Sequence, residues 1–255
     1  MTWSAAQYRL FEDERNRPLR DLLAALPEID ARSAVDLGCG PGNSTELLAT
    51  RLPQAVLLGI DASQDMIAAA RRRLPHTLFE LRDIGAWNDA GPFDVILANA
   101  SLHWLPDHER LLPALAGRLG AGGCLAVQMP DNLDEPTHRL MREIAAQIDP
   151  GRAVAAAAAR TAPAPPASYY RWLRAVCRKV DIWRTTYHHP LADGVRGIVE
   201  WFKGSALGPF LEPLGPNTRA EFIHRYTAAL EPVYSPLPDG TVLLPFPRLF
   251  IVARR

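Results

Sequence analysis

The stretch VDLGCGPGNST, residues 35–45, decides the fold, because it places three glycines in five positions between an apolar run and small polar residues. Glycine lacks a Cβ, so a ligand can approach the main chain closely where a strand turns into a helix. The N-terminus of the following helix offers unpaired N–H groups to the same ligand. The stretch therefore predicts a strand, a ligand-binding turn and a helix.

The spacing of the glycines separates two classes of ligand-binding turn. Dinucleotide-binding turns carry the pattern GxGxxG, whose third glycine lets the helix pack closely on the strand. Here Gly38 and Gly40 fit that pattern, but Asn43 occupies its third position and the glycine falls at Gly42 instead. The turn is therefore GxGxG and departs from the dinucleotide fingerprint.

Acidic residues end the next two predicted strands. Asp61 ends AVLLGID, where a carboxylate can accept both hydroxyls of a ribose. Asp83 ends TLFELRD and is followed by Ile84, where a carboxylate and a backbone N–H can read an adenine edge. A lone Asp at such a place is more often a loop residue or a helix cap. Their position at successive strand ends favours binding, because ligands of open parallel sheets lie beyond the carboxyl ends of the strands.

The rest of the chain predicts one α/β domain that spans residues 1–255. Apolar runs alternate with helical stretches, which is typical of a parallel sheet buried on both faces. Two later strands, VDIWRTTYHH and RLFIVARR, flank a mostly helical segment that predicts a cap. The predicted parts are an N-terminal helical arm, a cofactor-binding core, a first insertion with an Ala/Pro-rich surface segment (151–166), and the cap: 1–30, 31–130, 131–178 and 190–245.

Composition excludes several classes of partner. Lys and Arg number 28 and Asp and Glu number 28, so no global field attracts nucleic acid or an anionic membrane. Cys39, Cys124 and Cys177 lack the CxxC pairs of a zinc site, and we expect no metal. The N-terminal residues are charged and contain no apolar signal-peptide region, so we expect a cytoplasmic protein.

Four features together resemble the class I S-adenosylmethionine-dependent methyltransferases: VDLGCGPGN, Asp61, Asp83 and NASLHW (residues 99–104). Further blocks, including LAVQMPDN, EPTHRLMRE and FPRLFIVARR, extend the resemblance over nearly the whole chain, to members that esterify a small polycarboxylic acid. The resemblance implies a Rossmann-like seven-stranded sheet, mostly parallel with an antiparallel last strand, helices on both faces, and S-adenosyl-L-methionine as cofactor.

The resemblance also assigns cofactor-binding roles. Gly38, Gly40 and Gly42 would bring the main chain against the methionine moiety, Asp61 would hold the ribose, and Asp83 with Ile84 would bind the adenine. Asn99, at the end of the fourth strand, would offer an oxygen to the methionine ammonium. At Asn99 a simple turn residue is an equal alternative.

The implied acceptor is a polycarboxylate, whose chemistry sets what the site must contain. A carboxylate is already an anion at neutral pH, so no general base is expected and no catalytic residue is assigned. Arginines are suited to the non-reacting carboxylates, because the guanidinium binds a carboxylate through two N–H groups. The candidates lie on the last two strands, after the fourth strand and in the arm: Arg248, Arg184, Tyr187, His188, Trp104, His103, Tyr8 and Arg17.

Alternatives remain open at several of these positions. Each arginine could instead pair with a nearby acid, and His103, where such enzymes commonly carry Gln, could simply cap or pack. In the predicted strand, residues 182, 184 and 186 share one face and residues 183, 185 and 187 the other, and only one set can face substrate. Two other functions also remain open: methylation of a different acceptor on the same scaffold, and a non-catalytic S-adenosylmethionine-binding regulator.

Overall fold

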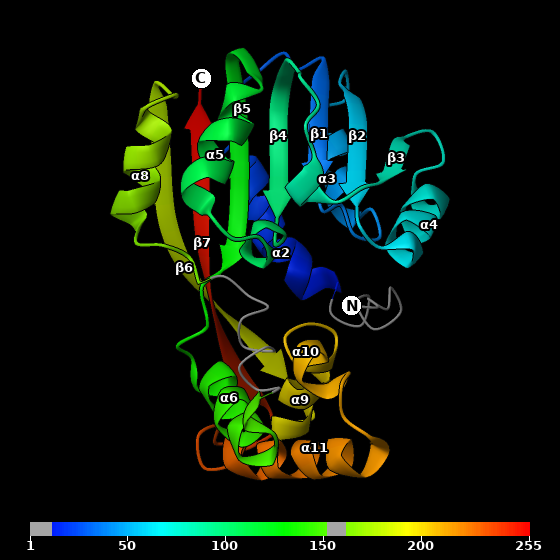
Figure 1. Ribbon diagram of the computed structural model, residues 1–255, viewed down its shortest axis with the longest axis vertical. Coiled ribbons are helices and arrows are strands. Elements are labelled where there is room, and N and C mark those ends of the chain that lie inside the picture. The colour runs from blue at the N-terminus through cyan, green and yellow to red at the C-terminus, as the bar shows by residue number, and fades with distance from the viewer. Residues whose placement is uncertain (1–11, 152–161) are drawn as a thin grey trace.

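The structure is a computed structural model that describes residues 12–151 and 162–255 (Figure 1). The strands are β1 (Ser33–Leu37), β2 (Val56–Asp61), β3 (Leu78–Leu81), β4 (Phe93–Asn99), β5 (Leu119–Pro130), β6 (Lys179–Leu191) and β7 (Val242–Arg254). The α-helices are α2 (Glu12–Ala24), α3 (Asn43–Arg51), α4 (Gln64–Arg73), α5 (His108–Gly117), α6 (Pro136–Ile148), α8 (Pro166–Arg174), α9 (Val195–Lys203), α10 (Gly208–Leu211) and α11 (Pro216–Leu230). Two 3-10 helices are η1 (Ile84–Ala86) and η2 (Leu102–Trp104).

The strands form a seven-stranded sheet in the order β3-β2-β1-β4-β5-β7-β6. Strands β1 to β5 pair in parallel, whereas β7 is antiparallel to both β5 and β6. The fold class expected from the sequence is therefore confirmed, including the antiparallel last strand. The carboxyl ends of the parallel strands meet at one edge of the sheet, where ligands of such folds bind.

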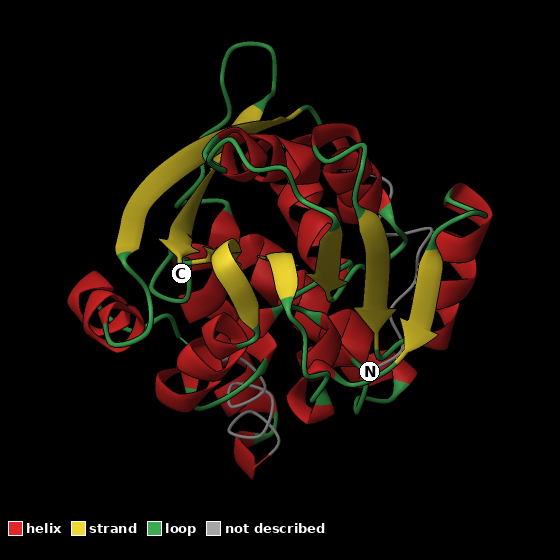
Figure 2. Ribbon diagram, turned by 90° about the horizontal axis from the view of Figure 1, so that it is seen from above, coloured by secondary structure: helices red, strands yellow, loops and turns green. Residues whose placement is uncertain are grey.

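Helices cover both faces of the sheet (Figure 2). Alternate residues of β4 face opposite sides, as period two requires: Val95 and Leu97 pack with α2 and α3, whereas Ile96 and Ala98 pack with α5 and α8. The sheet is thus buried between two apolar layers, and its strands read as continuous apolar runs.

A separate lobe, which we call the cap lobe, contains α6, α9, α10 and α11 and lies below the sheet in Figure 1. The last two strands reach it, because β6 and β7 stay paired as far as Leu191 and Val242, whereas β5 pairs with β7 only up to Arg248. The cap lobe has its own apolar core, built around Trp201, Phe222 and Tyr226. The helical pattern between the last two strands is therefore a folded lobe.

Two predicted features lie partly outside the described residues. These are the start of the helical arm, with Tyr8, and most of the Ala/Pro-rich segment, residues 152–161.

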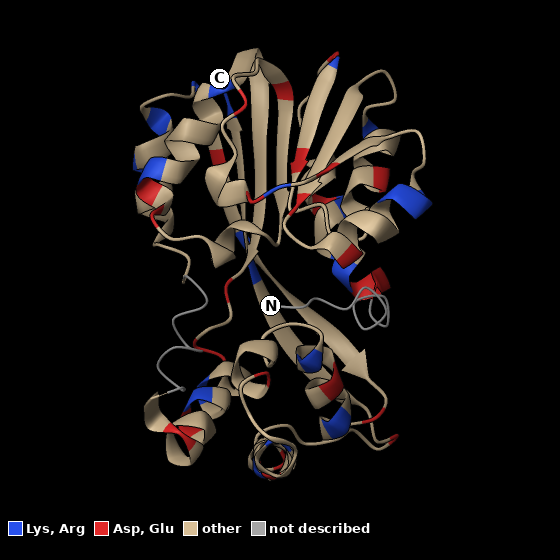
Figure 3. Ribbon diagram, turned by 45° about the vertical axis from the view of Figure 1, so that its right-hand side comes forward, with Lys and Arg blue, Asp and Glu red and all other residues tan. Residues whose placement is uncertain are grey.

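Acidic and basic residues are interspersed over both lobes (Figure 3). Within the described ranges, no helix combines the length and apolar character needed to span a membrane.

Candidate functional site

The glycine turn adopts conformations that favour glycine at each position. Gly38, Gly40 and Gly42 have φ angles of 79°, 54° and 92°. A Cβ on Gly38 would lie 2.4 Å from the Cβ of Ser101, and one on Gly42 would lie 3.1 Å from the Cα of Ala70. The turn between β1 and α3 is therefore held both by its backbone conformation and by the close packing of its neighbours.

The two acids predicted at strand ends lie where the sequence places them. Asp61 accepts a hydrogen bond from the Gly40 N–H at 3.0 Å and another from the Ser63 N–H at 2.8 Å. Burial raises the pKa of Asp61, and these two N–H groups oppose that rise. Asp83, which immediately precedes Ile84, is exposed and accepts a hydrogen bond from the Gly85 N–H at 2.8 Å.

Gly38, Gly40, Asp61 and Asp83 line one cavity of about 220 Å³, which we call the cofactor cleft, whereas Gly42 does not line it and packs against Ala70 of α4. Its lining comprises Gly38, Cys39, Gly40, Asn43, Ser44, Asp61, Ala62, Met66, Asp83, Ile84, Asn99, Ala100, Ser101, Trp104 and Leu105. Among the described residues, the buried atoms Asn99 Oδ1 and Ser101 Oγ have no hydrogen-bond partner. A cradle of bare backbone with unsatisfied oxygens fits a ligand such as S-adenosylmethionine, which brings an ammonium and hydroxyl groups.

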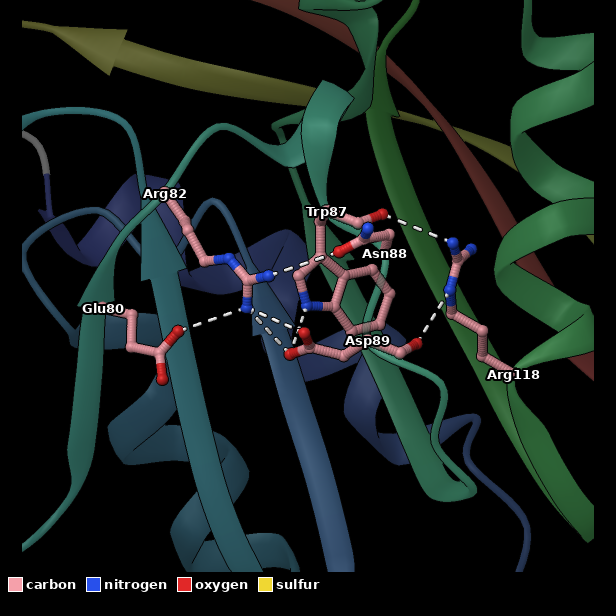
Figure 4. A network of polar contacts seen from close by, with 6 residues as sticks. All are labelled: Glu80, Arg82, Trp87, Asn88, Asp89 and Arg118. Carbon is pink, nitrogen blue, oxygen red and sulfur yellow. Dashed lines mark hydrogen bonds and ion pairs between the residues drawn. The ribbon is translucent and has the colours of Figure 1, made fainter.

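A polar network fixes the loop that follows Asp83 (Figure 4). Arg82 donates to both carboxylate oxygens of Asp89, at 2.8 and 3.0 Å, and the Trp87 indole N–H donates to Asp89 at 2.9 Å. Arg118 donates to the backbone carbonyls of Asp89 and Trp87 at 3.0 and 3.3 Å, and its guanidinium lies 5.1 Å from the centre of a Trp87 ring. The network holds the segment that carries Ile84 against α5.

Asp36 is a residue that sequence reasoning missed. It is fully buried beneath the glycine turn, and one carboxylate oxygen accepts from the hydroxyls of Ser44 and Thr45 at 2.6 and 2.7 Å. Burial raises the pKa of Asp36 from its ordinary 3.8 to about 6. The sequence did carry a signal for a buried carboxyl here, namely an Asp within an apolar run that predicts a parallel strand, because both faces of such strands are covered.

A second cavity, of about 80 Å³, shares Asn99, Ala100 and Trp104 with the cofactor cleft. We call it the arginine pocket. It is lined by Arg15, Asn99, Ala100, His103, Trp104, Pro130, Trp201, Ser205, Phe246 and Arg248. Residues of α2, of the segment after β4, of β7 and of the cap lobe thus converge beside the cofactor cleft.

Arg248 contributes a buried positive charge to this pocket. Its side chain is 5% exposed, its Nη1 donates to Gln128 Oε1 at 3.3 Å, and its guanidinium lies 4.5 Å from the centre of the Phe246 ring. The bond to Gln128 helps to orient the guanidinium. Arg248 therefore lies where the sequence predicts a carboxylate-binding group.

The arm contributes Arg15 to the pocket, and Arg17, the predicted candidate, does not line it. Arg17 is exposed and pairs with Asp21 one turn along α2, at 3.3 Å. Residues two apart on a helix point in nearly opposite directions, so only one of the two arginines can face inward. The guanidinium of Arg15 lies 5.4 Å from the centre of a Trp201 ring.

Arg184 and His188 also lie outside the arginine pocket, because of strand parity. Thr185 pairs with Arg248, and directly paired residues point to the same face, so Arg184 and His188 face the other way. Arg184 forms an ion pair with Asp131 at 2.7 Å and remains half exposed. His188 is exposed.

Tyr187 has the correct parity but is engaged elsewhere, since its hydroxyl donates to Asp21 at 2.7 Å. Its neighbour His189, which sequence reasoning missed, is buried and stacks on Trp201 with ring centres 4.5 Å apart. Burial, and then the charges of Arg248 and Arg15, lower the pKa of His189 to about 4. A neutral imidazole therefore supports the Trp201 wall of the pocket.

Trp104 and His103 take the positions expected of residues that follow the fourth strand. Trp104 lines both cavities, and His103 is buried, lines the arginine pocket and lies with its ring centre 4.8 Å from that of Trp104. Trp104 therefore lies between the two cavities, and His103 packs beside it on the side of the arginine pocket.

The sequence matches the family model described as a methyltransferase domain over residues 34–123. The chain also resembles solved structures in fold, among them that of a methyltransferase. A protein named YcgJ from Bacillus subtilis has a TM-score of 0.60 at 12% identity, with 93% of this chain and 97% of that chain covered. Phosphoethanolamine N-methyltransferase 2 from Haemonchus contortus, in complex with S-adenosyl-L-methionine, has a TM-score of 0.57 at 14% identity over 94% of this chain and 52% of that one.

Curated relatives are much closer in sequence and carry one name. The trans-aconitate 2-methyltransferase of Methylobacterium nodulans is 58% identical over 254 residues, covering 99% of this chain and 98% of that protein. The enzyme of the same name from Afipia carboxidovorans is 52% identical, covering 99% of both chains. Together with the glycine turn, the acids at the strand ends and the sheet order, this full-length identity shows that the chain belongs to the trans-aconitate 2-methyltransferase family.

Proposed function

We propose that this protein transfers a methyl group from S-adenosylmethionine to one carboxylate of trans-aconitate, or of a close polycarboxylate, giving a monomethyl ester. The observation that carries the proposal is the contact between the two cavities, because a cleft that fits the cofactor shares a wall with a pocket that contains two arginines. The free, buried cysteines further support a cytoplasmic setting.

We assign the cofactor roles as the sequence predicts them. Gly38 and Gly40 open the backbone to the methionine moiety, Gly42 supports the turn by its close packing on Ala70, and Asp61, beside Gly40, faces the ribose. Asp83 and Ile84 face the adenine, held by the Arg82–Asp89 network. The buried oxygen of Asn99 faces the methionine ammonium.

When bound, S-adenosylmethionine supplies an electrophilic methyl group on a sulfonium, which a carboxylate oxygen accepts as S-adenosylhomocysteine is released. The acceptor is ionised near pH 7, so the protein needs no general base. The protein's task is to hold one carboxylate oxygen in line with the bond between the methyl carbon and the sulfur, and to exclude water from that carboxylate. Trp104, Trp201 and Phe246 provide apolar walls for this purpose.

Arg15 and Arg248 bind the carboxylates that do not react. A cation directly on the attacking oxygen would lower its nucleophilicity, so the guanidiniums serve best at the far end of the acceptor. Each guanidinium can form a two-pronged contact with a carboxylate. A small pocket with two such groups favours a compact polyanion over a phenol or a monocarboxylate.

Turnover with labelled S-adenosylmethionine tests the proposal directly. We expect labelled methyl ester from trans-aconitate, a weaker signal from other tricarboxylates and dicarboxylates, and none from a monocarboxylate or a phenol. Faster methylation of an unrelated acceptor would favour another enzyme on the same scaffold. Binding of S-adenosylhomocysteine without turnover of any acid would favour a non-catalytic regulator.

Replacing Asp61 by alanine should weaken binding of S-adenosylhomocysteine by about 1.5 to 3 kcal/mol, because a charge-assisted hydrogen bond to the ribose is lost. The change also removes the carboxylate that accepts from Gly40 in the glycine turn. Asp61→Asn, which keeps one acceptor oxygen, should lose less. Calorimetric titration measures both, and an unchanged dissociation constant in folded Asp61→Ala protein would refute the ribose role.

A further inference from the structure

Two adjacent residues of α2 are connected to the two cavities, Asn16 through a residue that lines the cofactor cleft and Arg15 by lining the arginine pocket. Asn43, the first residue of α3 and part of the cofactor-cleft lining, donates through Nδ2 to Asn16 Oδ1 at 2.6 Å. Both side chains are buried, at 6% exposure for Asn16 and 2% for Asn43. The preceding residue, Arg15, lines the arginine pocket above Trp201.

Helix geometry explains why neighbours can serve two cavities. Successive side chains on an α-helix diverge by about 100°, so Arg15 and Asn16 reach in different directions from the same turn. Because the backbone between them is hydrogen-bonded helix, a displacement of Asn16 displaces Arg15 as well. The position of the guanidinium therefore depends on the contact between Asn16 and Asn43.

Further contacts fasten α2 to the cofactor-binding half of the molecule. Arg73 of α4 forms ion pairs with Glu12 of α2 and with Glu46 of α3, the latter at 2.9 Å. Leu19 and Leu22 are fully buried in the apolar layer that also includes α3. The first turn of α2 is thus held beside the glycine turn by charge and its later turns by apolar packing.

We propose that Asn16 is a positioning residue that couples the two pockets, so that a ligand in the cofactor cleft raises the affinity of the arginine pocket for a polycarboxylate. A ligand that orders Asn43 also orders Asn16 and the helix turn that bears Arg15. The acceptor then loses less conformational freedom when it binds. The inference rests on the proposed function for the identity of the acceptor only.

The coupling is measured by calorimetric titration of trans-aconitate with and without saturating S-adenosylhomocysteine. In the wild type, S-adenosylhomocysteine should tighten trans-aconitate binding about tenfold, and trans-aconitate should tighten S-adenosylhomocysteine binding by the same factor, because linkage is reciprocal. In Asn16→Ala the factor should fall below about threefold. Asn16→Asp, which keeps an acceptor for the Asn43 amide, should retain most of it, and Arg20→Ala, at an exposed position of α2, should retain all of it.

A second measurement needs no acceptor. S-adenosylhomocysteine alone should slow backbone hydrogen exchange in residues 13–20 of the wild type and of Arg20→Ala, and much less in Asn16→Ala. A coupling factor that stays at the wild-type value in folded Asn16→Ala, or equal exchange protection in that variant, overturns the inference. If trans-aconitate binds no form of the protein, the proposed function fails, and the exchange measurement still decides whether Asn16 ties α2 to the cofactor cleft.

Discussion

Replacing Arg248 by alanine should lower kcat/KM for trans-aconitate by an amount equivalent to about 2 to 5 kcal/mol, with the dissociation constant of S-adenosylhomocysteine nearly unchanged. The loss is large because the guanidinium is buried, so a carboxylate in the arginine pocket would be left without its partner. Arg248→Lys should recover only part of it, since an ammonium cannot reproduce the two-pronged contact. Steady-state kinetics with separate cofactor titration measure both quantities.

Arg184→Ala is the matched control, because it removes an arginine one pairing position away that faces the opposite side of the sheet and pairs with Asp131. We expect it to change kcat/KM little. An acceptor with one carboxylate converted to an amide adds a second test. The loss of kcat/KM for this amide, relative to trans-aconitate, should be smaller with Arg248→Ala than with the wild type, because the effects of removing the two partners of a direct contact are not additive. Additive losses, or a lowered melting temperature at unchanged activity, would make Arg248 a structural residue.

Replacing Asp36 by asparagine should change how stability depends on pH. The folded carboxyl, whose pKa burial raises to about 6, keeps its proton over a range in which the unfolded chain, at an ordinary 3.8, has lost it. This group therefore stabilises the fold fully below about pH 4, and its contribution is lost as the pH rises through about 6. Asparagine cannot ionise, so the variant lacks this loss.

The difference in unfolding free energy, Asp36→Asn minus wild type, should therefore grow by on the order of 2 kcal/mol between about pH 4.5 and pH 8. The slope decides the outcome, since the absolute stability also reflects the amide hydrogens that asparagine introduces into a buried site. Urea titrations of both proteins across this range measure the difference. A difference that stays flat with pH would show that Asp36 is not held with a raised pKa.

The cofactor cleft could be predicted from the sequence because its determinants are local. A glycine with positive φ, an acid at the end of an apolar run and a helix start each leave a mark within a few residues. Gly38, Asp61 and Asp83 therefore line the cavity that the sequence predicts. The alternation of strands and helices likewise predicted a parallel sheet, whereas the antiparallel last strand was implied by the family resemblance.

The arginine pocket could be predicted only in part, because its determinants are not local. Arg184 and Thr185 are neighbours in sequence, and only the pairing of Thr185 with Arg248 decides which of them faces the pocket. The choice between Arg15 and Arg17 likewise depends on how α2 is rotated on the sheet. His189 gave no distinct signal, since His188 beside it has the same chemistry.

The ribbon formed by β6 and β7 has a consequence for how acceptor specificity can change. Arg248 is the first residue of β7 along the chain that is paired on both sides, with Pro130 and with Thr185, whereas residues 242–247 pair with β6 alone. The charge that would hold the acceptor is therefore fixed by the same sheet hydrogen bonding that fixes the carboxyl ends of β4 and β5. Trp201 and Phe246 belong to the apolar core of the cap lobe. Substitutions at these two residues can therefore reshape the arginine pocket while the distance between the Arg248 guanidinium and the methyl donor stays fixed.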